Sequence, residues 1–379
     1  MRISDDVLNL KDTLMMDKNY FNANPELGFL EYKTSNYISK RLSELGFEVR
    51  ENIAQTGVMG LIRGDANKPC IMFRADMDAI LTDPDDPNSI KHACGHDAHM
   101  AILLGLANLL TQKKNSIKGT VKLVFQPGEE GLGGAASMID QGVLEHPTVD
   151  KAFALHVWSE VEEGKIGICG GPVMASGDEF LIEILGKAGH AALPEKSIDA
   201  IFIASQVVVA LQSIVSRNVS PIETVVVSIC SISGGCNFNT ICEKVTIKGT
   251  CRTYDNEVRR FVSERIKHIA VSIARSFGGD AVVEYIFKHP PVINSQEEAI
   301  QITKLSEQIV GSENVIKSYR TMCTEDFSHF QQKIPGTLTF IGCQSDKYYP
   351  QHNPNFYVNE KAMLIGLELF CSIAKKYLI

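Results

Sequence analysis

The 379-residue sequence has no long hydrophobic run, no basic excess and no apolar segment near its first residues. No stretch approaches the roughly 18 uninterrupted apolar residues of a membrane-spanning helix, and residues 1–6 do not start a secretory signal. The formal net charge of −8 provides no basic surface for nucleic acid or anionic lipid. We therefore expect a cytoplasmic protein that binds neither a membrane nor nucleic acid.

Cysteine is also sparse, with ten residues and no Cys-x-x-Cys pair, which excludes a disulfide scaffold. Cys230, Cys236, Cys242 and Cys251 lie close together in the sequence, three of them in or beside strand-like segments. A metal role for them is one interpretation. Buried free thiols are the simpler one, because free cysteine is among the most buried residue types.

The chain is longer than one hydrophobic core usually supports, which predicts two domains. Hydrophobic periodicity in the first part predicts alternating elements and therefore a largely parallel sheet flanked by helices. The predicted helices are 4–21, 32–46 and 98–112, and the predicted strands are 47–54, 58–63, 70–73, 120–125 and 151–155.

From residue 178 the predicted order changes to strand, helix, strand, strand, helix, strand, which is the ferredoxin-like βαββαβ pattern. Helix–strand alternation resumes at about residue 295, with a strand at 337–341. We predict an α/β fold with a first domain of residues 1–177 and 289–379 and an inserted domain of residues 178–288.

Polar residues gather where the strands of the predicted parallel sheet end. Sites in such sheets form beyond the carboxyl ends of the strands, so four separate segments should meet at one edge. These segments contribute Asp76 and Asp78; Cys94, His96, Asp97 and His99; Glu129 and Glu130; and His156, taken to follow the strand at 151–155.

This mixture of thiol, imidazole and carboxylate suits zinc, manganese, cobalt or nickel. Taken alone, Cys94 and His96 need not be ligands, because cysteine and histidine are both common in ordinary protein cores. The candidates together are too many for one four-coordinate ion, which predicts two. Asp78, Asp97 and His99 are better suited to orienting the ligands than to binding metal themselves.

Glu129 and Glu130 are adjacent carboxylates that repel each other unless a positive charge neutralises them. Neighbouring side chains point in different directions, so one can bind metal while the other holds the proton of a water molecule. A solvated charged turn is the alternative interpretation of the pair alone.

Several ordered motifs give the chain a resemblance to the metal-dependent amidohydrolases of the aminoacylase and carboxypeptidase G superfamily. It is most similar to the branch of hippurate hydrolases, N-acetyldiaminopimelate deacetylases and plant hydrolases of indole-acetyl amino acid conjugates. The motifs are Asn24-Pro-Glu-Leu-Gly-Phe29, Arg74-Ala-Asp-Met-Asp-Ala79, His92-Ala-Cys-Gly-His-Asp97, Gln126-Pro-Gly-Glu-Glu-Gly131, Ala154-Leu-His-Val157, Gly189-His-Ala-Ala192, Gly249-Thr-Cys-Arg252, Glu325-Asp-Phe-Ser328 and His352-Asn-Pro354.

The resemblance implies a catalytic domain with two divalent ions and an inserted lid domain that commonly forms a homodimer. Glu129 would be the general base. His190 would reach an active site, often that of the partner subunit, while Asn239 and Arg252 would contact the substrate. The implied metal ligands are Cys94, His96, Glu130, His156 and His352, and Asp78 and Asp97 would orient these ligands without binding metal.

The implied reaction is hydrolysis of the amide bond of an N-acyl amino acid. A dipeptidase or metallocarboxypeptidase needs the same groups, and a non-catalytic metal-binding or ligand-binding protein is a rival of another class. Three departures from the family pattern concern the substrate pocket and no predicted ligand. They are Asn22 in place of a histidine, Ile80-Leu-Thr82 followed by the acidic residues 83–87, and Asn239-Thr-Ile-Cys-Glu243.

Overall fold

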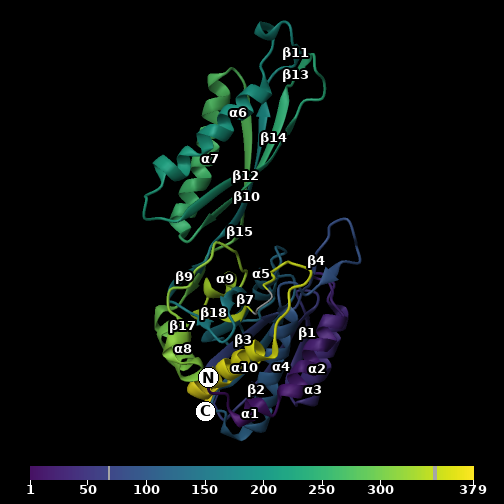
Figure 1. Cartoon of the computed structure of the whole chain (residues 1–379), viewed down its shortest axis with the longest axis vertical. Helices are drawn as coiled ribbons and strands as arrows, with labels where there is room; N and C mark the ends of the chain where they lie inside the picture. Colours follow the sequence, from purple (N-terminus) through teal and green to yellow (C-terminus); the bar gives the residue numbers. More distant parts are fainter. Residues whose placement is uncertain (67–68, 345–347) are drawn as a thin grey trace. The chain divides into compact units, whose positions relative to one another are not determined.

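The computed structural model describes residues 1–66, 69–344 and 348–379. The chain folds into two compact units (Figure 1). The first unit comprises Met1–Val173, Ile293–Tyr319 and Asp326–Ile379, and the second comprises Met174–Val292 and Arg320–Glu325.

An eight-stranded sheet forms the centre of the first unit, in the order β1-β2-β6-β3-β7-β18-β8-β17. The four adjacent strands β6, β3, β7 and β18 run parallel to one another, as predicted. The bounds are β1 (Glu48–Ile53), β2 (Gly57–Arg63), β3 (Cys70–Asp76), β6 (Thr120–Gln126), β7 (Lys151–Glu162), β8 (Ile166–Gly167), β17 (Val315–Ile316) and β18 (Gly336–Gln344).

Helices pack on this sheet and share one large hydrophobic core with it. α4 is buried along most of its length because its sequence is apolar on every side and it packs between β3, α2 and α10. The predicted helix at 4–21 is two helices, which separate at Asn9 and Leu10. The bounds are α1 (Asp5–Leu8), α2 (Lys11–Ala23), α3 (Tyr32–Glu44), α4 (His96–Gln112), α5 (Gly134–Asp140), α8 (Gln296–Val310), α9 (Ser328–Gln331) and α10 (Glu360–Leu378).

The second unit has the predicted βαββαβ order and its own hydrophobic core. Its antiparallel sheet has the order β12-β14-β10-β15, with α6 and α7 packed against it. The bounds are β10 (Gly177–Leu185), α6 (Ala200–Leu211), β12 (Val225–Gly234), β14 (Lys244–Thr253), α7 (Asn256–Ser276) and β15 (Asp280–His289). In the described part of the chain, no helix combines the length and apolarity needed to cross a bilayer.

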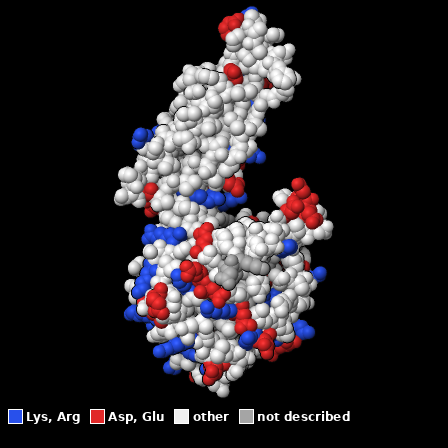
Figure 2. Space-filling model, viewed as in Figure 1, with Lys and Arg blue, Asp and Glu red and all other residues white. Residues whose placement is uncertain are grey.

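The acidic residues 83–87, where the sequence departs from the family pattern, lie in a hairpin between β4 (Ile80–Leu81) and β5 (Ile90–Lys91). Asp83, Asp85 and Asp86 are exposed there, and Figure 2 shows a group of acidic side chains at this place in the first unit. The backbone N–H groups of Asp85 and Asn88 donate to the Asp83 and Asp86 carboxylates, so the turn is stabilised locally.

Candidate active site

The predicted metal ligands and Glu129 lie together in the first unit, at the carboxyl edge of the parallel strands. Three groups of possible ligands lie wholly within this unit, and within each group one possible ligand atom per residue lies within 4.8 Å of the others. Because His96 and Glu130 each belong to two groups, the groups form one continuous cluster. The groups are Asp76, His96, His99 and His156; Cys94, Glu130 and His352; and His96, Glu129 and Glu130.

His156 lies inside β7, so the prediction that it follows a strand ending at 155 was wrong. The pairing of β7 with β3 ends at Ala154 of β7. The pairing of β7 with β18 continues beyond that residue, and β7 therefore extends to Glu162. The strand is therefore longer than its apolar run, and His156 lies level with the end of β3, next to Asp76.

The predicted helix start at residue 98 was also late, because α4 begins at His96. Gly95 caps the helix in the left-handed region, with φ 94° and ψ 13°. A side chain at Gly95 would meet the Val157 side chain at 2.4 Å. The turn at Gly95 therefore places Cys94 before the helix and His96 in its first turn.

Replacing Gly95 by alanine should remove metal binding and destabilise the first unit. A positive φ costs a residue with a Cβ about 1–3 kcal/mol, and the contact with Val157 adds to this. Gly46→Ala is the matched control, since Gly46 has φ 78° but no atom within 4 Å of the added Cβ. Thermal unfolding and metal analysis test this prediction. Equal unfolding temperatures and full metal content in both variants would contradict it.

His96 is held through one of its ring nitrogens. Its Nδ1 donates to the Asp78 carbonyl oxygen at 2.8 Å, whereas its buried Nε2 makes no hydrogen bond with any described residue and lies 3.7 Å from an Asp76 oxygen. Burial lowers the pKa of His96, but Asp76 and the other nearby acidic groups outweigh it and raise the pKa to about 10. The site therefore favours a positive charge at Nε2, whether a proton or a metal ion.

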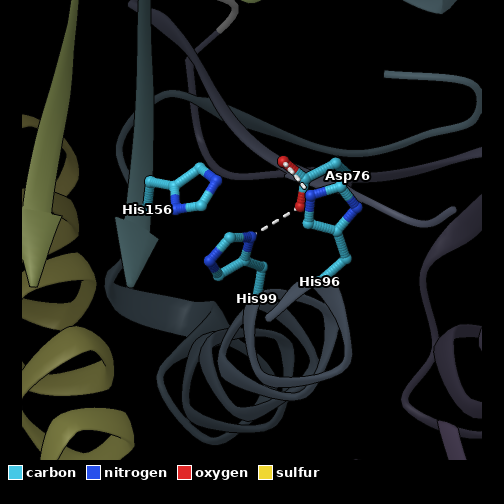
Figure 3. Close-up of side chains that lie close together, drawn as sticks. All are labelled: Asp76, His96, His99 and His156. Atoms are coloured by element: carbon cyan, nitrogen blue, oxygen red, sulfur yellow. Dashed lines mark hydrogen bonds and ion pairs between the residues drawn. The ribbon is translucent and has the colours of Figure 1, made fainter. Parts of the chain in front are cut away.

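His99 differs from His96, because both of its ring nitrogens make hydrogen bonds within the protein. The Val157 N–H donates to Nε2 at 2.9 Å, which places the ring proton on Nδ1, and Nδ1 donates to Asp76 at 2.6 Å. Figure 3 shows His99 and His96 projecting from α4 toward Asp76, with His156 opposite on β7. This geometry fits the predicted orienting role of His99.

Cys94 and His156 face each other, with 3.6 Å between Sγ and Nε2. His156 Nδ1 donates to the Val157 carbonyl oxygen at 2.7 Å, and burial lowers the pKa of the ring well below its usual range. Burial, with Glu130 and Glu129 nearby, raises the pKa of the Cys94 thiol. A thiolate at this position requires a neighbouring cation, as a metal ligand would have.

His352 reaches the cluster from the C-terminal part of the chain. Its backbone N–H donates to the Ala93 carbonyl oxygen at 2.8 Å, and its Nε2 lies 3.3 Å from a Glu130 oxygen. The hydrogen bond with Glu130 raises the pKa of His352. Only the resemblance to the family, and no pattern in the neighbouring residues, had singled out this histidine from the sequence.

Asp78 fixes the two glutamates. Its carboxylate oxygens accept the backbone N–H groups of Glu129 and Glu130, at 3.1 and 3.0 Å. The Glu129 side chain is 8% exposed, and one of its oxygens accepts the Asp326 N–H at 3.4 Å. Asp78 thus supports both His96 and the glutamate backbone.

Asp97 has contacts of another kind. It accepts a hydrogen bond from Asn22 Nδ2 at 3.0 Å and lies 3.6 Å from the buried Lys18 ammonium group. Both partners belong to α2, so Asp97 connects the first turn of α4 to that helix. Asn22, which replaces a histidine of the family pattern, therefore contacts Asp97, one of the residues predicted to orient the ligands.

A buried network surrounds Arg74 and was not predicted from the sequence. Its guanidinium group donates to Gln126 at 2.8 Å, to Asp76 at 2.8 Å and to Asp326 at 3.0 Å. All four side chains are essentially inaccessible to solvent. Arg74, Gln126 and Asp326 each stand in a quoted motif, and an arginine within an apolar strand was the signal that could have revealed the network.

The residues present fit divalent metal ions. The cluster combines buried thiol, imidazole and carboxylate donors, and His96 Nε2 is a buried acceptor with no hydrogen-bond donor among the described residues. Buried acidic groups outnumber the basic ones there, so bound cations would balance the charge.

The second unit carries the predicted catalytic residue His190 and the two predicted substrate-binding residues, but not in one place. His190 in β11 (Gly189–His190) pairs with Thr240 in β13 (Thr240–Ile241), and the Asn239 carbonyl oxygen accepts the Ala191 N–H at 3.0 Å. Arg252 lies near the far end of β14 and donates to the Cys251 carbonyl oxygen at 3.1 Å. His190 and Asn239 are therefore neighbours, and Arg252 is separate from them.

Comparisons with known proteins agree with this architecture. The chain is 38% identical to the "IAA-amino acid hydrolase ILR1-like 4" of Arabidopsis thaliana, over 94% of this chain and 83% of that protein. It is 34% identical to the hippurate hydrolase of Campylobacter jejuni over the full length of both. A solved Bacillus subtilis structure, described as a dinuclear metal-binding peptidase of family M20, has a TM-score of 0.83 and 30% identity, covering 97% of this chain and 98% of that one.

The model of the peptidase family M20/M25/M40 matches residues 72–376. The chain belongs to this family, and it is a metal-dependent hydrolase of amide bonds.

Proposed function

We propose that this protein hydrolyses the amide bond of small N-acyl amino acids and releases a carboxylic acid and a free amino acid. The observation that carries the proposal is a buried glutamate, Glu129, adjoining the metal-ligand cluster. The names of the two relatives, a hippurate hydrolase and a hydrolase of amino acid conjugates, support this substrate class.

The ligand set of this proposal is Cys94, His96, Glu130, His156 and His352, holding two divalent ions chosen from zinc, manganese, cobalt and nickel. When bound, these ions would lower the pKa of water toward about 7 and polarise the amide carbonyl.

Glu129 carries out the proton transfers. Its carboxylate takes a proton from the attacking water as the oxygen adds to the amide carbon. The same carboxyl group then gives the proton to the leaving nitrogen, so that the amine departs neutral. The hydrogen bond from the Asp326 N–H to Glu129 supports the orientation of the base.

His190 is suited to stabilising the carbonyl oxygen. The Ala192 N–H donates to its Nδ1 at 3.1 Å, which places the proton of the neutral ring on Nε2 as a donor. In the same proposal Asn239 and Arg252 bind the carboxylate of the amino acid, for which a guanidinium group has matching geometry.

We assign residues 178–288 a lid role and a dimerisation role. In β14 the nine residues from Lys244 to Arg252 span about 27 Å, and His190 pairs with Thr240, just before the Lys244 end of the strand. We infer that His190 and Arg252 are too far apart to hold one small substrate in one subunit. A homodimer would let one active site use both. β12 is an edge strand, and Ile201, Phe202 and Val209 of α6 are 47–69% exposed. The ten free cysteines support a cytoplasmic location.

A dipeptidase or metallocarboxypeptidase is the second candidate, supported by the description of the solved structural relative as a peptidase. The test is a panel of N-benzoyl and N-acetyl amino acids and dipeptides, assayed with enzyme loaded separately with each of the four metals. We expect the N-acyl amino acids to have the highest kcat/KM. Faster cleavage of the dipeptides would favour the second candidate, and no cleavage of any compound by fully loaded enzyme would refute both.

A further inference from the structure

The segment of residues 24–31 has no part in the reaction proposed above. It nevertheless lies against the loop that carries Glu129, residues 127–130, which we call the glutamate loop. The Glu31 side chain is fully buried, and one of its oxygens accepts the Gly128 N–H at 3.0 Å. Its other oxygen accepts the Thr56 hydroxyl group.

Three consecutive N–H groups of the glutamate loop donate to carboxylates. Gly128 donates to Glu31, while Glu129 and Glu130 donate to the two oxygens of Asp78. Two side chains from distant parts of the sequence therefore set the orientation of successive peptide groups. Since these peptides fix where the Glu129 and Glu130 side chains point, the position of the base depends on both carboxylates.

Packing reinforces the hydrogen bond. A Cβ atom at Gly128 would lie 3.1–3.3 Å from the ring of Phe29, and one at Gly28 would lie 3.0 Å from the Gly128 Cα. Gly128 has φ 58°, a conformation that suits glycine. The segment thus touches the glutamate loop through backbone, ring and carboxylate.

The segment is itself firmly anchored. The Glu26 carboxylate accepts the Thr34 N–H at 2.9 Å at the start of α3, and the Glu26 carbonyl oxygen accepts the Ala79 N–H at 2.8 Å. Ala79 follows Asp78 directly, so this hydrogen bond joins the segment to the residue that holds the Glu129 and Glu130 backbone. Supporting contacts of this kind can hold a reacting group to the precision that catalysis requires.

We propose that residues 24–31 support the glutamate loop and hold its conformation, and that Glu31 is a positioning residue for Glu129. The proposal rests on the proposed function only in giving Glu129 the role of base. Without an acceptor the buried Gly128 N–H would be unsatisfied, and the loop would move to find another partner. Glu31 is a cleaner probe than Asp78, because the Asp78 carboxylate also lies 3.4 Å from His96 Nδ1.

The test compares Glu31→Leu, which removes the acceptor, with Glu31→Gln, which keeps it. Glu298→Leu is the control, since Glu298 is a buried carboxylate paired with Lys151 at the start of β7, away from the cluster. We expect Glu31→Leu to lower kcat about tenfold or more with KM nearly unchanged. Glu31→Gln should restore kcat to within about threefold of wild type, and Glu298→Leu should lower the unfolding temperature without changing kcat.

A second readout does not depend on the substrate. Hydrogen–deuterium exchange of the peptide spanning residues 126–131 should be faster in Glu31→Leu than in wild type, Glu31→Gln and Glu298→Leu. Unchanged exchange in Glu31→Leu would overturn the proposal, as would equal kcat losses in the two Glu31 variants. If Glu31→Leu does not fold, Phe29→Leu should show the same faster exchange, and its absence would likewise overturn the proposal. If the wild-type protein does not hydrolyse N-acyl amino acids, the proposed function is refuted. Hydrogen–deuterium exchange then decides by itself whether Glu31 holds the glutamate loop.

Discussion

The Glu129→Gln variant is expected to bind its full complement of metal and to lose nearly all turnover. Glutamine has the shape of glutamate but cannot accept the proton of the attacking water, and proton transfer of this kind contributes roughly 10²–10⁴-fold to rate. The backbone N–H of residue 129 would still donate to Asp78, so the loop should keep its conformation. Metal should remain because the predicted ligand is Glu130, which is unaltered.

The measurement is kcat for release of the free amino acid, together with metal content per subunit. Glu162→Gln is a suitable control, because Glu162 is an exposed carboxylate at the end of β7. Near-normal turnover in Glu129→Gln would remove Glu129 from the role of base. Loss of metal in this variant would instead indicate that Glu129 is a ligand.

Mixing two inactive variants should restore activity if His190 acts on the active site of the partner subunit. Glu129→Gln lacks the base, and His190→Ala lacks the donor to the carbonyl oxygen, whose removal typically costs about 10²–10³-fold in kcat. In a mixed dimer one active site combines an intact Glu129 with an intact His190 from the other subunit. With random pairing, about a quarter of all sites would be active.

Co-expression with two different affinity tags isolates the mixed dimers for assay. Each variant purified alone provides the control, and both should retain metal. If His190 served its own subunit, no site in the mixed dimer would be complete and activity would stay at the level of the single variants. Full activity of His190→Ala alone would show that this histidine is not part of the reaction.

Much of the fold was predictable because it follows from local patterns. Apolar runs of strand length, such as residues 120–125, were recognised as buried strands, and the βαββαβ order of the second unit was correct. The grouping of Cys94, His96 and Glu130 at one edge was also predictable, because parallel strands present their carboxyl ends together.

Boundaries were less predictable where distant strands decide them. β7 runs through His156 because β18 continues to pair with it, and β18 is about 180 residues away in the sequence. The start of α4 at His96 depends on the left-handed Gly95, and a glycine alone does not reveal its φ.

The sequence by itself determined the chemical types available at this site, thiol, imidazole and paired carboxylates, and the strand ends that present them. Only the tertiary structure decided which atoms face each other. It placed His352 beside Glu130, left Nε2 of His96 without a hydrogen-bond donor among the described residues, and brought Glu31 under the glutamate loop. The physical reason is that hydrogen bonds and burial depend on atoms brought together by packing, whereas residue type and periodicity are properties of the local chain.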